Sequence, residues 1–279
     1  MAERQFSHDG ISLALEDVGS GPPILLIHGF PLDHGMWDAQ IESLRGRFRV
    51  IAPDLRGLGR SRLAAGDEEL GVGMERYAAD LAAMLDWLSI GEPIVAVGFS
   101  MGGYVALQLA LRWPKRLRGL VLCDTRAAAD AEEARAARIK MAEAVMQSGS
   151  AAPALAMLPK LLAQRTQDER PDIAERVRGI IERQRPEGIA AAQRGMARRE
   201  DVRGRLDHII AHSLCIVGRE DAISPPAEMH EMAVLLAKSG DDDVRLVEVE
   251  NAGHLAPIEN PAAVTDAIRT FAQECYRPA

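Results

Sequence analysis

The chain has 279 residues, of which 47% are hydrophobic, so it can bury one large core without help from a metal or a disulfide. Its formal net charge of −8 argues against nucleic acid as a partner, because phosphate binding relies on a clustered excess of Lys and Arg. No segment approaches the roughly 20 apolar residues of a membrane span, and residues 1–10 are too polar for a secretory signal.

The chain contains three cysteines, Cys123, Cys215 and Cys275. Their odd number and wide spacing match neither a disulfide framework nor a C-x-x-C metal or redox site, which favours a reducing compartment. We therefore expect a cytoplasmic protein that binds neither a membrane nor nucleic acid.

The first predicted elements are two strands, at residues 5–8 and 10–18, which could pair as an antiparallel edge. Short apolar runs bounded by turn residues then recur, and such runs are typical of strands buried on both faces: 24–27, 50–52, 94–97, 120–123 and 214–217. Longer segments with helical spacing lie between these runs. The alternation of strand and helix predicts an α/β fold with a mostly parallel sheet covered by helices.

Residues 126–205 interrupt this alternation, and we interpret them as an inserted helical cap. Pro153, Pro171 and Pro186 stand where proline is tolerated, near the first turn of a helix. The segment has 16 Lys and Arg against 12 Asp and Glu, which indicates either solvated helix faces or a weak preference for anionic substrates. Apolar residues recur in it at helical spacing: Ile139, Ala142, Val145 and Met146; Leu155, Leu158, Leu161 and Leu162; Ile173, Val177, Ile180 and Ile181; and a last group over 189–196.

After the cap, the alternation of Val with Glu over residues 244–250 suits an outer strand with one wet face. His208 and His212 have the i, i+4 spacing of metal ligands, but they lack the glutamate of H-E-x-x-H. We expect these two histidines to finish a helix, and we expect no metal site.

The pattern that carries most chemical information is G-x-S-x-G, centred on Ser100 between Gly98 and Gly102. It follows the predicted strand at 94–97, and a helical segment begins directly after it, so Ser100 occupies a sharp turn between strand and helix. Glycine on both sides relieves the crowding at such a turn. The alternative is a glycine-rich turn that only packs a helix on the sheet.

A serine hydroxyl becomes a good nucleophile when a neighbouring base removes its proton. His254 lies in a glycine-containing loop after the last predicted strand, which places it at the carboxyl end of the sheet beside the serine turn. Asp221 follows the strand at 214–217, and the order Ser100, Asp221, His254 is the hydrolase order of nucleophile, acid and base. Asp124 competes for the role of acid because it ends the strand at 120–123, but we favour Asp221.

Attack on an ester creates an oxyanion, which backbone N–H groups can stabilise. Met101 follows the nucleophile at the start of a helix, and Phe30 follows the strand at 24–27. We expect these two amides to form the oxyanion hole. His28 is expected to order its loop rather than titrate in the reaction.

Over nearly its whole length the chain resembles the α/β-hydrolase superfamily, on four segments: His28-Gly29-Phe30-Pro31, residues 53–61, residues 98–103, and Gly253-His254. The resemblance implies an eight-stranded, mostly parallel sheet with a cap after strand six, and no cofactor. It divides the chain into a core of residues 1–125 and 206–279 and a cap of residues 126–205. It is closest to small microbial carboxylesterases and enol-lactonase-like members.

We therefore expect a serine hydrolase that cleaves small carboxylic esters. Lactonase, perhydrolase and C–C bond hydrolase activities remain open with the same triad, and so does a receptor that binds a small ligand without turnover. Several apolar residues are candidate walls of the substrate pocket, although side chains at such spacing also build plain core: Trp37, Tyr104, Met141, Met146, Met157 and Leu158.

Overall fold

A computed structural model describes residues 3–151, 156–237 and 244–277. Its centre is an eight-stranded sheet in the order β1-β2-β4-β3-β5-β6-β7-β8. Strand β2 is antiparallel to both β1 and β4, and every other neighbouring pair is parallel. The strands are β1 Glu3–His8, β2 Ile11–Val18, β3 Pro23–Ile27, β4 Arg49–Pro53, β5 Ile94–Phe99, β6 Leu117–Cys123, β7 His212–Gly218 and β8 Arg245–Val249.

The predicted α/β fold and each predicted strand are confirmed. Strands β3 and β5 are buried at every residue, as expected of central parallel strands covered on both faces. Strand β8 lies at the outer edge and is only partly buried along most of its length, which agrees with its alternating sequence.

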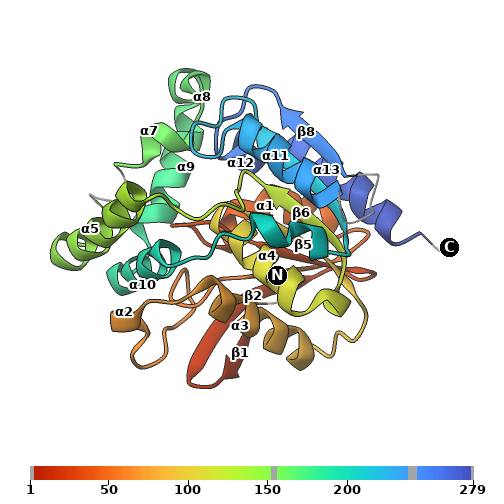
Figure 1. Cartoon of the computed structure of the whole chain (residues 1–279), viewed down its shortest axis with the longest axis horizontal. Coiled ribbons are helices and arrows are strands. Elements are labelled where there is room, and N and C mark those ends of the chain that lie inside the picture. The colour runs from red at the N-terminus through yellow and green to blue at the C-terminus, as the bar shows by residue number, and fades with distance from the viewer. Residues whose placement is uncertain (1–2, 152–155, 238–243, 278–279) are drawn as a thin grey trace.

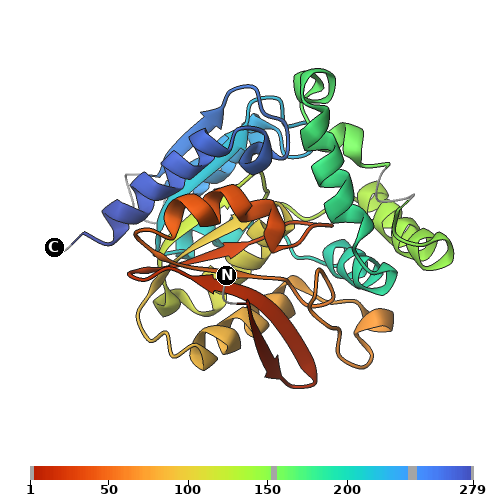
Figure 2. The same cartoon turned by 180° about the vertical axis from the view of Figure 1, so that it is seen from behind.

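Helices cover both faces of the sheet. Helices α3 (Met74–Trp87), α4 (Met101–Arg112) and α11 (Pro226–Ala237) lie on the face toward the viewer in Figure 1. Figure 2 shows α1 (Asp38–Leu44) and α13 (Pro261–Cys275) together on the opposite face. The shorter described elements are η1 His34–Trp37, α2 Asp67–Leu70, η2 Pro114–Arg116, η3 Arg203–His208 and α12 Ala256–Glu259.

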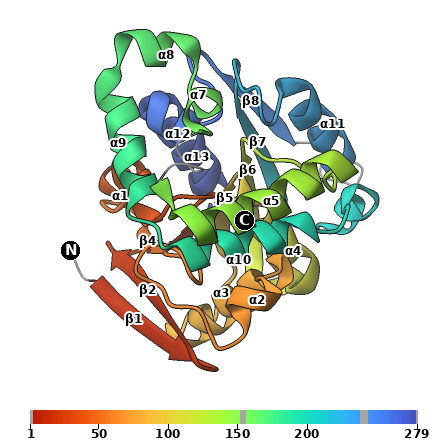
Figure 3. The ribbon, with the colours of Figure 1, turned by 90° about the vertical axis from the view of Figure 1, so that its left-hand side faces the viewer.

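A helical insertion between β6 and β7 gathers at one end of the molecule, where Figure 3 shows it facing the viewer. Pro171 and Pro186 begin α9 and α10, as predicted. The described helices of the insertion are α5 Glu132–Ser148, α7 Leu158–Leu161, α8 Gln164–Glu169, α9 Pro171–Glu182 and α10 Pro186–Ala197.

Two details of the insertion differ from the expected pattern. Helix α8 was not predicted, because its sequence Gln-Arg-Thr-Gln-Asp-Glu carries no apolar stripe. Of the group expected around 155–162, Leu158 and Leu161 lie in the short α7 and Leu162 directly follows it, whereas Pro153 and Leu155 lie outside the described residues.

The prediction that His208 and His212 finish one helix is wrong. His208 ends η3, whereas His212 is the first residue of β7, so the two histidines do not share a helix face. No helix among the described residues is both long enough and apolar enough to cross a membrane.

Arginines from the insertion donate hydrogen bonds to core backbone carbonyls. Arg176 reaches Gly35 O at 2.8 Å, and Arg194 reaches Glu68 O at 2.7 Å. Some arginines of the insertion therefore do not lie only on solvent-exposed helix faces, but connect the insertion to loops of the core.

Candidate active site

The turn between β5 and α4 holds Ser100 in a strained backbone conformation, with φ 51° and ψ −115°. Its crowding explains the flanking glycines. A Cβ on Gly98 would lie 2.4 Å from Gly102 O, and a Cβ on Gly102 would lie 2.2 Å from Ile27 O. The sharp turn lifts the Ser100 side chain to the carboxyl edge of the sheet, where it is partly exposed.

The imidazole of His254 bridges Ser100 and Asp221. Its Nδ1 lies 2.9 Å from Asp221 Oδ2, and its Nε2 lies 2.9 Å from Ser100 Oγ. Because an ionised carboxylate only accepts, Nδ1 carries the proton and donates it, which leaves Nε2 free to accept the Ser100 hydroxyl. Asp221 is itself fixed, since its Oδ1 accepts hydrogen bonds from the backbone N–H groups of Ile223 and Ser224 at 2.7 and 2.9 Å.

Asp124, the competing acid, has a different set of partners. Its Oδ1 accepts the Gly218 N–H at 2.7 Å, while its Oδ2 is buried without a hydrogen-bond partner among the described residues. Burial raises the pKa of Asp124 well above its usual range, and the nearby Asp221 charge raises it further. Asp124 therefore lies beside the His254–Asp221 pair, and its described side-chain hydrogen bond runs to Gly218 rather than to His254.

The loop that carries His254 is tied to the cap by Glu259. This buried carboxylate accepts the Gly253 N–H at 2.9 Å and the Ala163 N–H at 2.8 Å. Burial raises the pKa of Glu259, although these hydrogen bonds partly oppose the effect. Sequence reasoning missed this residue, because nothing in the local pattern indicates a buried acid whose partner lies 96 residues away.

The two expected oxyanion donors come from the serine turn and from the loop after β3, the strand that pairs with β5. Met101 is the first residue of α4, so its N–H is one of the orphan donors at the helix start. The Phe30 N–H has no acceptor among the described residues. Both amides are thus available to an oxygen of a bound substrate.

His28 organises the loop that contains Phe30. The Leu55 N–H donates to His28 Nε2 at 2.8 Å, so the proton resides on Nδ1, which donates to Gly29 O at 2.8 Å. Complete burial lowers the pKa of His28 and keeps it neutral. Both nitrogens are therefore occupied in holding backbone.

The candidate pocket residues fall into three environments. Trp37 is fully buried and packs edge-on against Phe99 at 6.4 Å between ring centroids. Tyr104 is nearly buried, with the Arg199 guanidinium 4.3 Å above its ring. The cap residues are more open: Met141, Met157 and Leu158 are partly buried against the core, and Met146 is 40% exposed.

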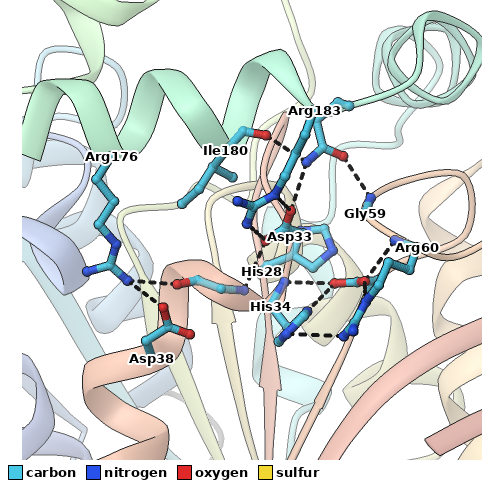
Figure 4. Close-up of polar contacts among 12 residues, drawn as sticks. His28, Asp33, His34, Asp38, Gly59, Arg60, Arg176, Ile180 and Arg183 are labelled. Carbon is cyan, nitrogen blue, oxygen red and sulfur yellow. Dashed lines mark hydrogen bonds and ion pairs between the residues drawn. The ribbon is translucent and has the colours of Figure 1, made fainter. Parts of the chain in front are cut away.

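Asp33, His34 and Asp54 form a compact polar cluster in the segments that follow β3 and β4 (Figure 4). One potential ligand atom from each residue lies within 4.8 Å of the others. The Arg183 guanidinium already neutralises Asp33, at 2.7 Å. Asp54 accepts from His34 Nδ1 at 2.6 Å and from the Arg60 N–H at 2.9 Å. Since cationic and N–H donors hold the oxygens that a metal would need, the cluster does not fit a metal site.

Comparison with known proteins identifies the family of the chain. Residues 22–261 match the model of the alpha/beta hydrolase fold. The chain belongs to this family.

Its similarity to individual members extends over almost the whole chain. A thermophilic esterase from Thermogutta terrifontis is 42% identical, with a TM-score of 0.92, over 99% of this chain and 100% of that one. The enol-lactonase from Burkholderia xenovorans LB400 is 27% identical, with a TM-score of 0.87, over 97% of this chain and 100% of that one. A pimeloyl-[acyl-carrier protein] methyl ester esterase from Aeromonas hydrophila is 28% identical, over 94% of this chain and 99% of that protein. The chain is thus an esterase-like hydrolase.

Proposed function

We propose that this protein is a serine hydrolase that cleaves small carboxylic esters through an acyl-enzyme on Ser100. The observation that carries the proposal is the unbroken hydrogen-bonded chain from Ser100 through His254 to Asp221, at the carboxyl ends of β5, β7 and β8. The similarity to the Thermogutta esterase supports the same activity.

In this mechanism His254 Nε2 takes the Ser100 proton as Oγ attacks the ester carbonyl, and Asp221 stabilises the imidazolium that forms. The carbonyl oxygen becomes an oxyanion, which accepts hydrogen bonds from the N–H groups of Phe30 and Met101. His254 then donates its proton to the departing alcohol. A water molecule, deprotonated by the same imidazole, attacks the acyl-enzyme. The imidazolium then returns this proton to Ser100 Oγ as the ester bond to Ser100 breaks and the carboxylic acid leaves.

We further propose that residues 126–205 act as a cap that contributes the acyl and alcohol pocket. Met141, Met146, Met157 and Leu158 are the cap candidates for its walls, with Trp37 and Tyr104 from the core. The substrate is a small neutral or weakly acidic ester, and no metal or cofactor takes part in the proposed steps.

Replacing Ser100 tests the proposal directly. The Ser100→Ala variant should lose hydrolysis of p-nitrophenyl acetate and butyrate, because no other group forms the acyl-enzyme. An organophosphonate probe should label the unaltered protein once and should not label the variant. Ser148→Ala, at an exposed serine of α5, is the matched control and should keep full activity. Activity or labelling that survives Ser100→Ala would overturn the proposal, and absence of both from the unaltered protein would favour a ligand-binding receptor.

Lactone opening is a second candidate, favoured by the 0.87 TM-score to the Burkholderia enol-lactonase. It uses the same acyl-enzyme, but the leaving alcohol stays attached to the acyl group. A panel of linear esters and five- and six-membered lactones, compared by kcat/KM, separates the two activities.

A further inference from the structure

Asp33 is a buried carboxylate on the loop that presents the proposed oxyanion donor Phe30. Only 2% of its surface is exposed, and it lies three residues after Phe30. Its oxygens accept from Gly35 N at 3.0 Å and from two nitrogens of Arg183 at 2.7 Å each. Gln184 adds a fourth hydrogen bond at 3.0 Å. Three of these four donors come from the cap, at the end of α9 (Figure 4).

Helix α9 contacts the same loop at a second point. Arg176 lies seven residues before Arg183, about two helical turns along the same face, and donates to Gly35 O at 2.8 Å and to Asp38 at 3.1 Å. Gln184 also accepts the Gly59 N–H at 2.7 Å, so it joins the Phe30 loop to the neighbouring loop after β4.

Dense packing connects this loop to the reacting groups. Trp37, at the end of η1, packs edge-on against Phe99, and Phe99 lies 5.2 Å from the His254 ring. A Cβ on Gly29 would lie only 2.6 Å from the Phe99 ring. Because the interior leaves little free space here, a shift of the Phe30 loop alters its position relative to the serine turn.

We propose that Arg183 and Gln184 are positioning residues for the oxyanion hole, which hold the Phe30 loop against Ser100 through the buried carboxylate of Asp33. This inference rests on the proposed serine-hydrolase function. It assigns to the cap a part in catalytic geometry that is separate from forming the substrate pocket.

The chemistry of the contact supports a positioning role. A guanidinium that meets a carboxylate through two parallel hydrogen bonds fixes both distance and orientation, which a single-point contact does not. A buried carboxylate that loses its cation leaves an uncompensated charge in the interior, and the loop must move to bring that charge to water. Arg183 itself is half exposed and can be solvated, so the penalty for breaking the pair falls on Asp33 and its loop.

The first test compares Arg183→Gln with Arg178→Gln, a matched control on the same helix whose arginine forms an ion pair with Glu175 of its own helix. Amide hydrogen exchange should rise over residues 28–37 in Arg183→Gln and stay unchanged in Arg178→Gln. This measurement does not depend on ester hydrolysis, and unchanged exchange in Arg183→Gln would overturn the inference.

The second test asks whether catalysis follows the loop. In Arg183→Gln, kcat for p-nitrophenyl butyrate should fall about 10- to 100-fold while KM changes less than about threefold, because a displaced oxyanion donor weakens the transition state more than the bound substrate. Inhibition by phenylboronic acid, which forms a tetrahedral anionic adduct on serine, should weaken by the same factor as kcat/KM. A rise in KM alone would show that Arg183 only shapes the pocket.

Asp33→Asn supplies the decisive rescue. It removes the buried charge, so the double variant Asp33→Asn/Arg183→Gln should recover kcat to within about threefold of Asp33→Asn alone. Failure of this rescue, with both single variants folded by circular dichroism, would overturn the inference. Activity that persists in Ser100→Ala would instead overturn the proposed function, and the exchange result would still stand by itself.

Discussion

The strand ends of the core and the interface between core and cap position their residues by different means. We call this interface, where Asp33 meets Arg183 and Glu259 meets Ala163, the seam. At the strand ends, the sheet's own backbone pairing continues into the site: Ser100 N donates to Cys123 O at 2.9 Å, and Asp124 N donates to Ile216 O at 2.9 Å. Along the seam, side chains such as Arg183 and Glu259 make the connection. Backbone pairing therefore places the residues at the strand ends, whereas side chains from distant parts of the sequence connect the neighbouring loops to the insertion.

The largest expected effect separates the two acids at the strand ends. Asp221→Asn should lower kcat by roughly 10⁴-fold, because the amide cannot enforce the tautomer of His254 or stabilise its imidazolium. Asp124→Asn should keep activity within about threefold, because the described hydrogen bonds of His254 run to Ser100 and Asp221, and the amide oxygen of Asn can still accept the Gly218 N–H. Ester hydrolysis at pH 7 measures both variants. The opposite result, with Asp124→Asn inactive and Asp221→Asn active, would reverse the assignment of the acid.

An intermediate effect is expected at Glu259, where the seam meets the catalytic loop. Glu259→Gln keeps the shape but turns one acceptor into a donor, so the N–H of either Gly253 or Ala163 loses its partner. An unsatisfied buried donor costs about 1–3 kcal/mol, and part of that cost should appear as a roughly tenfold lower kcat through displacement of His254. Steady-state kinetics measure it. Glu250→Gln, at an exposed glutamate of the same loop, is the control. Equal kcat values for the two variants would show that the contacts of Glu259 do not affect catalysis.

The smallest expected effect concerns stability and pH at the His34–Asp54 pair beside the seam. Burial alone would lower the pKa of His34, but the hydrogen bond and charge of Asp54 raise it above its usual value. Burial opposes ionisation of Asp54, yet the hydrogen bond and charge of His34 lower its pKa to about 2. His34 therefore binds its proton more tightly in the folded chain than in the unfolded one.

The stabilisation from His34 should be complete below the unfolded pKa of about 6.5 and should be lost as the pH rises through the higher folded pKa. The contribution of Asp54 is present above its unfolded pKa and is lost as the pH falls through about 2. Urea unfolding should show that the free energy of unfolding falls by on the order of 1 kcal/mol between pH 5.5 and pH 9. His34→Gln should flatten this difference, whereas His230→Gln, at an exposed histidine of α11, should leave it in place. If the free energy of unfolding of His34→Gln still differs between the two pH values by the same amount, the His34–Asp54 pair is not the cause.

Local sequence patterns were sufficient to predict the order of the strands in the chain, the turn at Ser100 and the place of the helical insertion. These features are local, because hydrophobic periodicity and glycine spacing report on residues within one strand or one turn of helix. The rule that parallel strands present their carboxyl ends on one edge then brings Ser100, Asp221 and His254 to the same side of the sheet. Local patterns failed where they were weak, as in the polar helix α8, or ambiguous, as for His208 and His212.

The pairing of each carboxyl group with its partner depends on long-range tertiary contacts. Asp221 and Asp124 both follow buried strands, and the sequence favoured Asp221 without excluding Asp124. The structure shows that Asp221 meets His254, whereas Asp124 meets Gly218. Asp33 and Arg183 are 150 residues apart, and each alone has the sequence context of an ordinary surface charge. Contacts of this kind depend on how the cap settles on the core, so their energy arises from burial and geometry that no local pattern encodes.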